Sequence, residues 1–368
     1  MTHGFAMYYT FGRMLLEGED FRKAYDFEYF KSKIKEYGIT DIVDMPNNIP
    51  TNALALVSVA WLPAGVGKVV WSLFSLVALG FSAKILFQLH EISYTENLGL
   101  GLATLVFIWR PSYDNIALGQ MYFVVLFLFC LSMVGLKRSR DVLSSVPISL
   151  TFLLKGYGIV PLVWLGIAKH YKTALMVIVW ILAVVLLTLP AFDVETWTTY
   201  YSKVITKLGT HPWLPSPVIE LPATVVQLLS YLLNIVLVVA VLRHSVSSTQ
   251  TDVLLSYSAA IAAGVITAPL AEEYPFVLFL PLVMGLAVAI AKEYQQSRRL
   301  RPTAWIFAMS ILVMALPLRY KALQFSEAPL VLLAYPKLYA GIALLWCFKR
   351  LVSHRKATVS IAGKKFVG

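Results

Sequence analysis

The sequence predicts an all-α protein whose helices cross a membrane many times. Three observations support this: the composition, the apolar runs and the placement of the charges. Apolar residues make up 58% of the 368 residues and charged residues 14%, whereas soluble domains average about 45–50% and about 25%. The mean hydropathy is +0.72. An outer surface this apolar needs lipid around it.

Eight apolar runs approach the length of about 20 residues that a membrane-spanning helix needs. They are 69–87, 120–137, 173–191, 223–243, 253–270, 275–291, 303–318 and 331–348. Three shorter runs, 97–110, 142–154 and 157–168, require packing among other helices or a break at mid-depth. Residues 52–63 are too short to cross, so we predict an interfacial or re-entrant helix, with a tilted short span as the alternative.

The charges predict the orientation of these helices. The following segments hold 17 of the 31 Lys and Arg residues but only 5 of the 20 Asp and Glu residues: 84–96, 137–141, 169–172, 243–252, 292–302 and 349–368. Cytoplasmic loops of membrane proteins are rich in Lys and Arg. We therefore expect these segments inside and the acidic loops outside. The net charge of +11 has the same explanation, and no nucleic-acid partner is predicted.

We predict a multi-pass protein of the cell membrane with three parts: an extracytoplasmic region 1–50, a transmembrane domain 51–349 and a cytoplasmic tail 350–368. Residues 1–50 are polar and amphipathic, and an outer region normally follows a hydrophobic anchor. Met1 is therefore expected to be an internal methionine of a longer chain. Cys130 and Cys347 lie in apolar runs, where a thiol is usually a packing residue. No Cys/His cluster has metal-ligand spacing, so no metal site is predicted.

Several short motifs lie on the predicted outer face in a fixed order. They are Gly4-Phe5-Ala6-Met7-Tyr8-Tyr9, Arg13, Leu15-Leu16-Glu17-Gly18, Tyr25-Asp26, Leu62-Pro63 with Trp71, Gly119-Gln120, Lys155 with Pro161, and Ala268-Pro269-Leu270-Ala271-Glu272-Glu273-Tyr274. A basic turn, Lys137-Arg138-Ser139-Arg140, precedes Lys155. Each motif alone is common, but their order and topology together are more specific.

In this order the motifs resemble glycosyltransferase family 87, the polyprenol-phosphate-mannose-dependent α-mannosyltransferases with the C-type glycosyltransferase architecture. The resemblance covers residues 4–290. It implies an inverting transfer of a sugar, mannose in the family, from a polyprenyl-phosphate donor to a lipid-linked or glycan acceptor. Membrane lipid, donor and acceptor are the expected partners, and no cofactor is expected. One departure matters: the catalytic Asp of the family falls on Gly4, which cannot accept a proton.

A base must take the proton of the acceptor hydroxyl, and three other carboxylates are candidates. Asp20 and Asp26 lie in the first outer loop, where the family keeps its base, although ordinary loop charge also explains them. Glu273 lies in a short turn close to the bilayer surface, where ionisable groups are costly and usually functional. Two solvated carboxylates in that turn are the alternative.

The departing lipid phosphate needs cationic or hydrogen-bonding groups. Lys155 is the strongest candidate, because it lies between two short apolar runs that resemble a broken helix pair; a lysine that snorkels to the interface is the alternative. Other candidates for substrate binding, on weaker grounds, are Arg13, Gln120, Tyr8, Glu272 and Tyr274. The aromatic residues among them are equally typical of an interfacial belt.

Two other functions remain open from the sequence. A transporter or flippase often shows internal repeats and ionisable residues at mid-membrane, but no repeat is found here and the ionisable residues gather at one face. A catalytically inactive member of the same fold is compatible with Gly4. The absence of an Asp-x-Asp pair argues against a metal-held nucleotide sugar.

Overall fold

The structure is a computed structural model, and it describes residues 3–40, 46–93, 95–206, 223–243, 250–268, 272–318 and 335–365. Within these ranges every regular element is a helix, which confirms the predicted all-α membrane fold class. The chain divides into two compact units. The first holds Met1–Ile85, Ser112–Ile159 and Tyr171–Pro212, and the second holds Leu86–Pro111, Val160–His170 and Trp213–Gly368.

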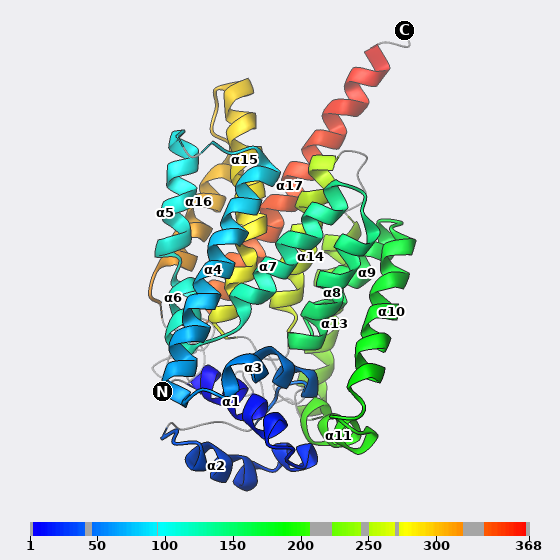
Figure 1. The fold of residues 1–368 in the computed structure, drawn as a ribbon. Coiled ribbons are helices and arrows are strands. Elements are labelled where there is room, and N and C mark those ends of the chain that lie inside the picture. The colour runs from blue at the N-terminus through cyan, green and yellow to red at the C-terminus, as the bar shows by residue number, and fades with distance from the viewer. Residues whose placement is uncertain are drawn as a thin grey trace. The chain divides into compact units, whose positions relative to one another are not determined.

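Short helices of the first unit gather at one end of its longer helices (Figure 1). They are α1 (His3–Leu16), η1 (Phe21–Tyr25), α2 (Phe27–Glu36), η2 (Pro50–Asn52), α3 (Ala53–Ala60), α11 (Val194–Tyr200) and η3 (Tyr201–Ile205). Their core is aromatic: the Phe11 ring lies 5.2 Å from Phe21 and 5.3 Å from Phe30, between centroids, in edge-to-face geometry. The predicted N-terminal region therefore folds as a packed helical layer.

The longer helices of the first unit are α7 (Tyr122–Lys137), α8 (Asp141–Lys155), α10 (Tyr171–Thr188) and most of α4 (Ala64–His90) and α6 (Arg110–Leu118). Helix α8 packs against both α7 and α10. Close approach to α7 requires a glycine, since a Cβ on Gly135 would lie 2.5 Å from the Ser144 amide nitrogen. On the other side the Ser149 hydroxyl donates to the Val177 carbonyl of α10 at 3.0 Å.

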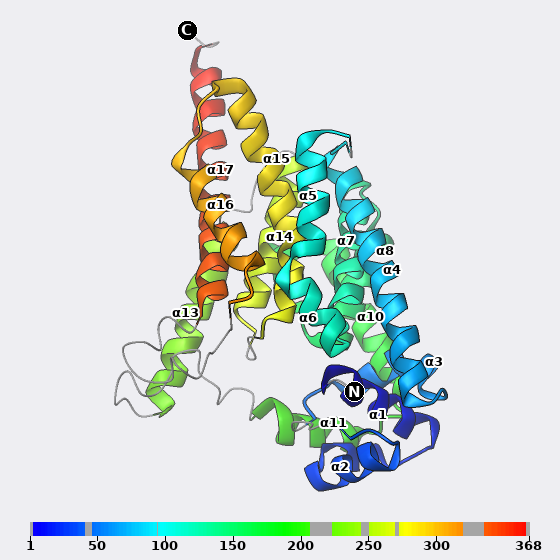
Figure 2. The same ribbon diagram turned by 90° about the vertical axis from the view of Figure 1, so that its left-hand side faces the viewer.

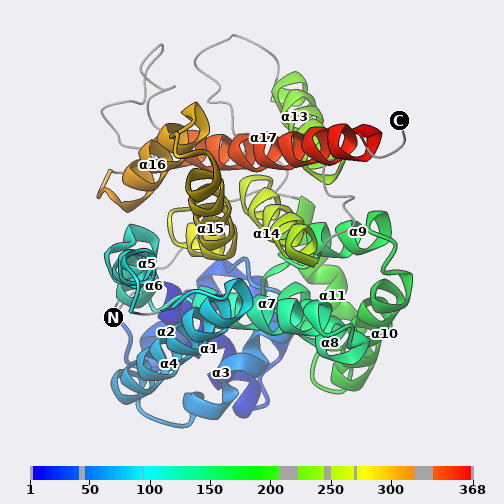
Figure 3. The same cartoon turned by 90° about the horizontal axis from the view of Figure 1, so that it is seen from above.

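The second unit contains α5 (Asn97–Ile108), most of α9 (Ile159–Ile167), α13 (Ala223–Arg243), α14 (Gln250–Ile266), η4 (Tyr274–Phe279), α15 (Leu280–Ser297), α16 (Pro302–Ala315) and α17 (Pro336–Lys365). Helices α14 and α15 pack against each other and against α17, and α16 also packs on α17. Figures 2 and 3 show this grouping from the side and from above. Helix α15 is buried along most of its length, as a central helix of a membrane bundle would be.

Among the described residues, three helical stretches are long and apolar enough to cross a membrane: Ala64–His90, Tyr171–Thr188 and Tyr274–Ser297. Helix α10 leaves Leu175, Val179, Leu182 and Leu186 exposed, as a lipid-facing helix does. The other five predicted spans fall on α7, α13, α14, α16 and α17. Residues 269–270 and 331–334, at the edges of two of these spans, lie outside the described residues. The predicted start of the cytoplasmic tail at residue 350 falls inside the continuous helix α17.

Candidate functional site

Lys155 is the last residue of α8, and it joins α8 to the N-terminal layer of the first unit. Its ammonium nitrogen donates to the Asn48 side-chain oxygen at 3.1 Å. The same nitrogen lies 4.6 Å from the centroid of the Tyr8 ring and 5.6 Å from that of Tyr122. Gly156 ends the helix directly after it, with φ of +73°, a left-handed conformation that glycine adopts at no steric cost. Gly156 therefore ends α8 directly after Lys155, whose ammonium group lies over two aromatic rings.

The segment that carries Asn48 is fixed to the end of α8 by its own polar side chains. The Thr51 hydroxyl donates to the Leu153 carbonyl at 2.6 Å, and the Asn52 amide donates to the Leu154 carbonyl at 2.9 Å. The last carbonyls of a helix have no partner within it. These two bonds therefore give the last carbonyls of α8 their partners, and they also hold the segment of Asn48 against the end of the helix. We call Tyr8, Asn48, Asn52, Gln120, Tyr122 and Lys155 the Lys155 cluster.

Two amide atoms of the cluster have no hydrogen-bond partner among the described residues. They are the side-chain nitrogen of Asn48 and the side-chain oxygen of Asn52, both buried. Buried polar atoms are hydrogen-bonded in the great majority of cases, so an orphaned one calls for an explanation. One donor and one acceptor beside an ammonium group are what a polar ligand with phosphate and hydroxyl groups would use.

Gly4 allows Gln120 to take the space of its missing side chain. A Cβ at Gly4 would lie 2.5 Å from the Gln120 amide nitrogen and 2.8 Å from the Leu118 carbonyl oxygen. The Gln120 oxygen accepts a hydrogen bond from the Tyr8 hydroxyl, so the amide is held from both sides. The place where the family resemblance puts a catalytic aspartate is therefore filled by an uncharged amide.

Three of the nine predicted site residues, Tyr8, Gln120 and Lys155, are brought together in the Lys155 cluster. Arg13 lies elsewhere on α1: it pairs with Glu17 at 2.6 Å, and its guanidinium group donates to the Ala60 carbonyl at 3.1 Å. The first bond stabilises the end of α1, and the second joins α1 to the end of α3. Neither bond joins Arg13 to the Lys155 cluster, and its role in substrate binding stays a prediction.

Asp20 and Asp26 cap the helices that follow them. The Asp20 carboxylate accepts from the Arg22 amide, and hydrogen bonds from the Arg22 guanidinium hold the pKa of that carboxyl below its usual value. The Asp26 carboxylate accepts from the Tyr29 amide at 3.0 Å. Asp26 is also tied to the cluster through its neighbour, because the Tyr25 hydroxyl donates to the Asn48 carbonyl at 2.9 Å.

Glu272, Glu273 and Tyr274 lie in the second unit, just before and at the start of η4. The Glu273 carboxylate pairs with the Lys337 ammonium at 2.5 Å, and Lys337 is fully buried. Burial of a lysine requires such a partner. Glu273 therefore has a structural contact of its own, and its predicted catalytic role stays a prediction, as do the roles of Glu272 and Tyr274. Residues 269–271 of the same motif lie outside the described residues.

The sequence reasoning missed Asn48, Asn52 and Tyr122. Asparagines between helices usually form turns, and Asn52 meets Leu154 across 102 positions of the chain, a separation at which sequence pattern carries no signal. Tyr122 begins an apolar helix, where an aromatic residue is ordinary.

Residues 49–215 match the family model of glycosyltransferase family 87. The matched range contains Asn52, Gln120, Tyr122 and Lys155, and it begins after Tyr8, Asp26 and Asn48. The comparisons with curated proteins and with solved structures gave no match. The resemblance drawn from the motifs is thus confirmed for the middle of the chain. Over residues 49–215, the chain is similar to glycosyltransferase family 87.

Proposed function

We propose that the protein transfers a sugar, with mannose as the first candidate, from a polyprenyl-phosphate sugar to a lipid-linked or glycan acceptor on the outer face of the cell membrane. The family match supports glycosyltransferase activity. The observation that carries the choice of donor is the Lys155 cluster, which combines an ammonium group with two orphaned amide atoms, one on Asn52 inside the matched segment and one on Asn48 just before it.

The reaction is a single displacement with inversion. The acceptor oxygen forms a bond to the anomeric carbon while the bond from that carbon to the phosphate oxygen breaks. The proton of the acceptor hydroxyl passes to a base, and polyprenyl phosphate leaves as the anion. Charge develops on the phosphate oxygens, so groups that stabilise it there accelerate the step.

Lys155 and Asn48 are the proposed partners of the leaving phosphate. A lysine ammonium is a compact charge with three donors, and among the described residues Lys155 uses one of them, for its hydrogen bond to Asn48. The orphaned Asn48 nitrogen adds a neutral donor. The Asn52 oxygen is the proposed acceptor of a sugar hydroxyl, and the rings of Tyr8 and Tyr122 form an aromatic surface beside the Lys155 ammonium group.

Asp26 is the proposed base among Asp20, Asp26 and Glu273. Asp20 and Glu273 are ion-paired with Arg22 and Lys337, so both carboxylates already have a cationic partner. The described bond of the Asp26 side chain comes from a neutral backbone amide. Asp26 is also exposed and follows Tyr25, which is anchored to Asn48.

Membranes that contain the full chain, supplied with a radiolabelled polyprenyl-phosphate mannose, test this proposal. We expect a labelled lipid or glycan product that needs the protein, and no product from the nucleotide sugar GDP-mannose when synthesis of the lipid donor is blocked. Product formed directly from the nucleotide sugar would contradict the proposed donor. Movement of the labelled lipid across the membrane without product would favour a flippase.

Gly4 supports a second candidate, a member of the family that binds the donor but does not transfer the sugar. In this case the Gln120 amide, in place of a carboxylate, would hold the donor without activating an acceptor. Binding of the lipid donor without turnover, under conditions in which several acceptors are supplied, would favour this candidate.

A further inference from the structure

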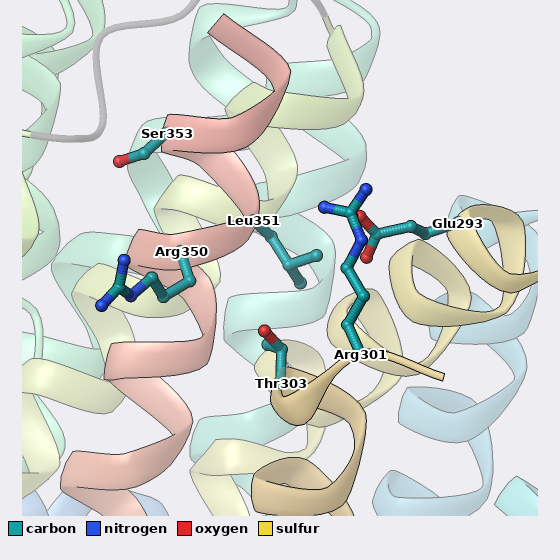
Figure 4. A pocket seen from close by; sticks show the side chains of 6 residues that line it. All are labelled: Glu293, Arg301, Thr303, Arg350, Leu351 and Ser353. Carbon is teal, nitrogen blue, oxygen red and sulfur yellow. The ribbon is translucent and has the colours of Figure 1, made fainter. Parts of the chain in front are cut away.

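A cavity of about 280 Å³ lies within the second unit, where α15 ends, α16 begins and α17 passes beside them. Its lining residues are Glu293, Arg301, Thr303, Arg350, Leu351 and Ser353 (Figure 4). The two walls are joined by a contact of the Cys347 sulfur with the Thr303 carbonyl at 3.6 Å. The volume is just below that of pockets for drug-sized ligands, about 300–1,000 Å³, so a headgroup fits it better than a whole lipid.

The lining is polar and carries a net positive charge. Arg301 pairs with Glu293 at 2.8 Å, and Figure 4 shows these two side chains side by side with Leu351 projecting toward them from α17. This pair balances one guanidinium group, while Arg350 adds a second. The hydroxyls of Thr303 and Ser353 complete a set of donors suited to phosphate oxygens, which arginine binds with its planar array of N–H groups.

An exposed apolar stripe runs along α17 up to the cavity. Tyr339, Ile342 and Trp346 are exposed at helical spacing, and Arg350 continues the same stripe. The Arg350 guanidinium lies over the Trp346 ring, 5.0 Å from its centroid. Tryptophans in membrane proteins concentrate at the level of the lipid headgroups. Arg350 therefore ends the stripe where a headgroup would meet it.

Helix α16 carries a second stripe that starts beside the cavity. Trp305, Met309 and Leu312 are exposed at helical spacing after Thr303. Two apolar stripes that lead away from one cationic cavity suit a molecule with a phosphate at one end and acyl chains at the other. A free phosphate has no apolar part that could contact these stripes.

We propose that this cavity binds the phosphate of an anionic membrane phospholipid on the cation-rich side of the protein. Residues 292–302 and 349–368 are the segments that the sequence assigns to the cytoplasm, where anionic lipids attract clusters of Lys and Arg. The inference does not depend on the proposed sugar transfer.

Native mass spectrometry of the purified full chain in detergent micelles tests the proposal with three probes: phosphatidylglycerol, phosphatidylcholine and glycerol 3-phosphate. We expect one saturable site for phosphatidylglycerol. Arg350→Ala removes a charged hydrogen bond to the phosphate and should weaken this binding about tenfold. Lys349→Ala is the matched control, because it removes the same charge from the adjacent, exposed position outside the cavity lining; its effect should stay below about twofold.

An equal loss for Arg350→Ala and Lys349→Ala would overturn the proposal, since it would show general attraction to a basic surface. Equal affinity for phosphatidylcholine would overturn the anionic selectivity, and equally tight glycerol 3-phosphate would show a soluble phosphate site. If Arg350→Ala does not fold, Ser353→Ala tests the same cavity through an exposed hydroxyl, with an expected loss of about threefold.

Discussion

At the scale of single residues, Asp20 and Asp26 both cap helices, but only Asp26 is proposed to take the proton of the acceptor. Substitutions of the two residues can therefore distinguish proton transfer from helix capping. Asp26 caps α2 through the Tyr29 amide, and asparagine caps a helix about as well as aspartate. Asp26→Asn should therefore keep the fold but lower the rate of sugar transfer at least about 100-fold, as loss of a general base does. The measurement is the initial rate with labelled donor, next to the thermal unfolding temperature.

Asp20→Asn is the control for Asp26. The change keeps a capping side chain at η1 and removes the pairing with Arg22, so the rate should fall by less than about threefold. A rate for Asp26→Asn that equals that of wild type would contradict the assignment of the base.

Gly4 is held to glycine by packing. A methyl group there would lie against the Gln120 amide and the Leu118 carbonyl, and overpacking of a filled site costs about 1–3 kcal/mol. Gly4→Ala should therefore lower the unfolding temperature. Gly18→Ala is a poor control because Gly18 has positive φ, whereas Gly80→Ala adds its methyl group into open space on α4 and should not destabilise. Unchanged stability of Gly4→Ala would contradict the described position of Gln120.

Residue chemistry predicted part of the Lys155 cluster. Lys155 and Gln120 stand out in sequence because polar groups at the ends of apolar runs are costly, and both lie in the cluster. The orphaned amides of Asn48 and Asn52 could not be predicted, because their role arises only when residues about a hundred positions away fold against them.

At the scale of elements, a pH-dependent contact fixes α2 to the end of α1. The Glu19 carboxylate accepts from the Lys33 ammonium and, at 2.6 Å, from the Tyr29 hydroxyl. The Lys33 hydrogen bond is the largest cause that lowers the pKa of Glu19, with the Tyr29 bond second. A carboxyl whose pKa is lowered by folding stabilises the fold at pH values above its unfolded pKa, and this contribution is lost as the pH falls through the folded value.

Hydrogen exchange of the α2 amides tests this contact. Near pH 6, Glu19→Gln should exchange faster than wild type, by no more than the roughly fivefold that a surface pair of about 1 kcal/mol allows. Once the intrinsic pH dependence of exchange is removed, the difference should vanish as the pH falls through the pKa of Glu19 in the folded state, which folding lowers below its usual value. Glu28→Gln, an exposed change in the same helix, should show no such convergence. A difference that persists at low pH would contradict the ion pair.

The period and length of the apolar runs predict most of the longer helices. The run 142–154 predicts α8 at Asp141–Lys155, and the run 173–191 predicts α10 at Tyr171–Thr188. The helices inside residues 1–50 were not located, because their apolar residues serve an aromatic core rather than a continuous run. The continuation of α17 past residue 350 was also missed, since a polar stretch carries no hydrophobic signal.

At the scale of the whole molecule, charge predicts the sidedness of the loops. Ser32 is exposed on α2 and Ser297 is exposed at the end of α15, in the cation-rich segment 292–302. Both natural cysteines are buried, so single introduced thiols are readable. Ser32→Cys in intact cells should react with a membrane-impermeant maleimide, and Ser297→Cys should react only after lysis. The reverse pattern would contradict the predicted orientation.

The proposed sugar transfer depends on stabilisation of the leaving phosphate of a lipid-linked sugar by Lys155. Its most direct test is the kcat/KM for labelled polyprenyl-phosphate sugar in Lys155→Met, which keeps much of the side-chain volume and removes the charge. Lys35→Met, an exposed change on α2, is the control. We expect a loss of at least about 100-fold for Lys155→Met and less than about twofold for Lys35→Met, with both variants folded. Wild-type kcat/KM in folded Lys155→Met would contradict the claim.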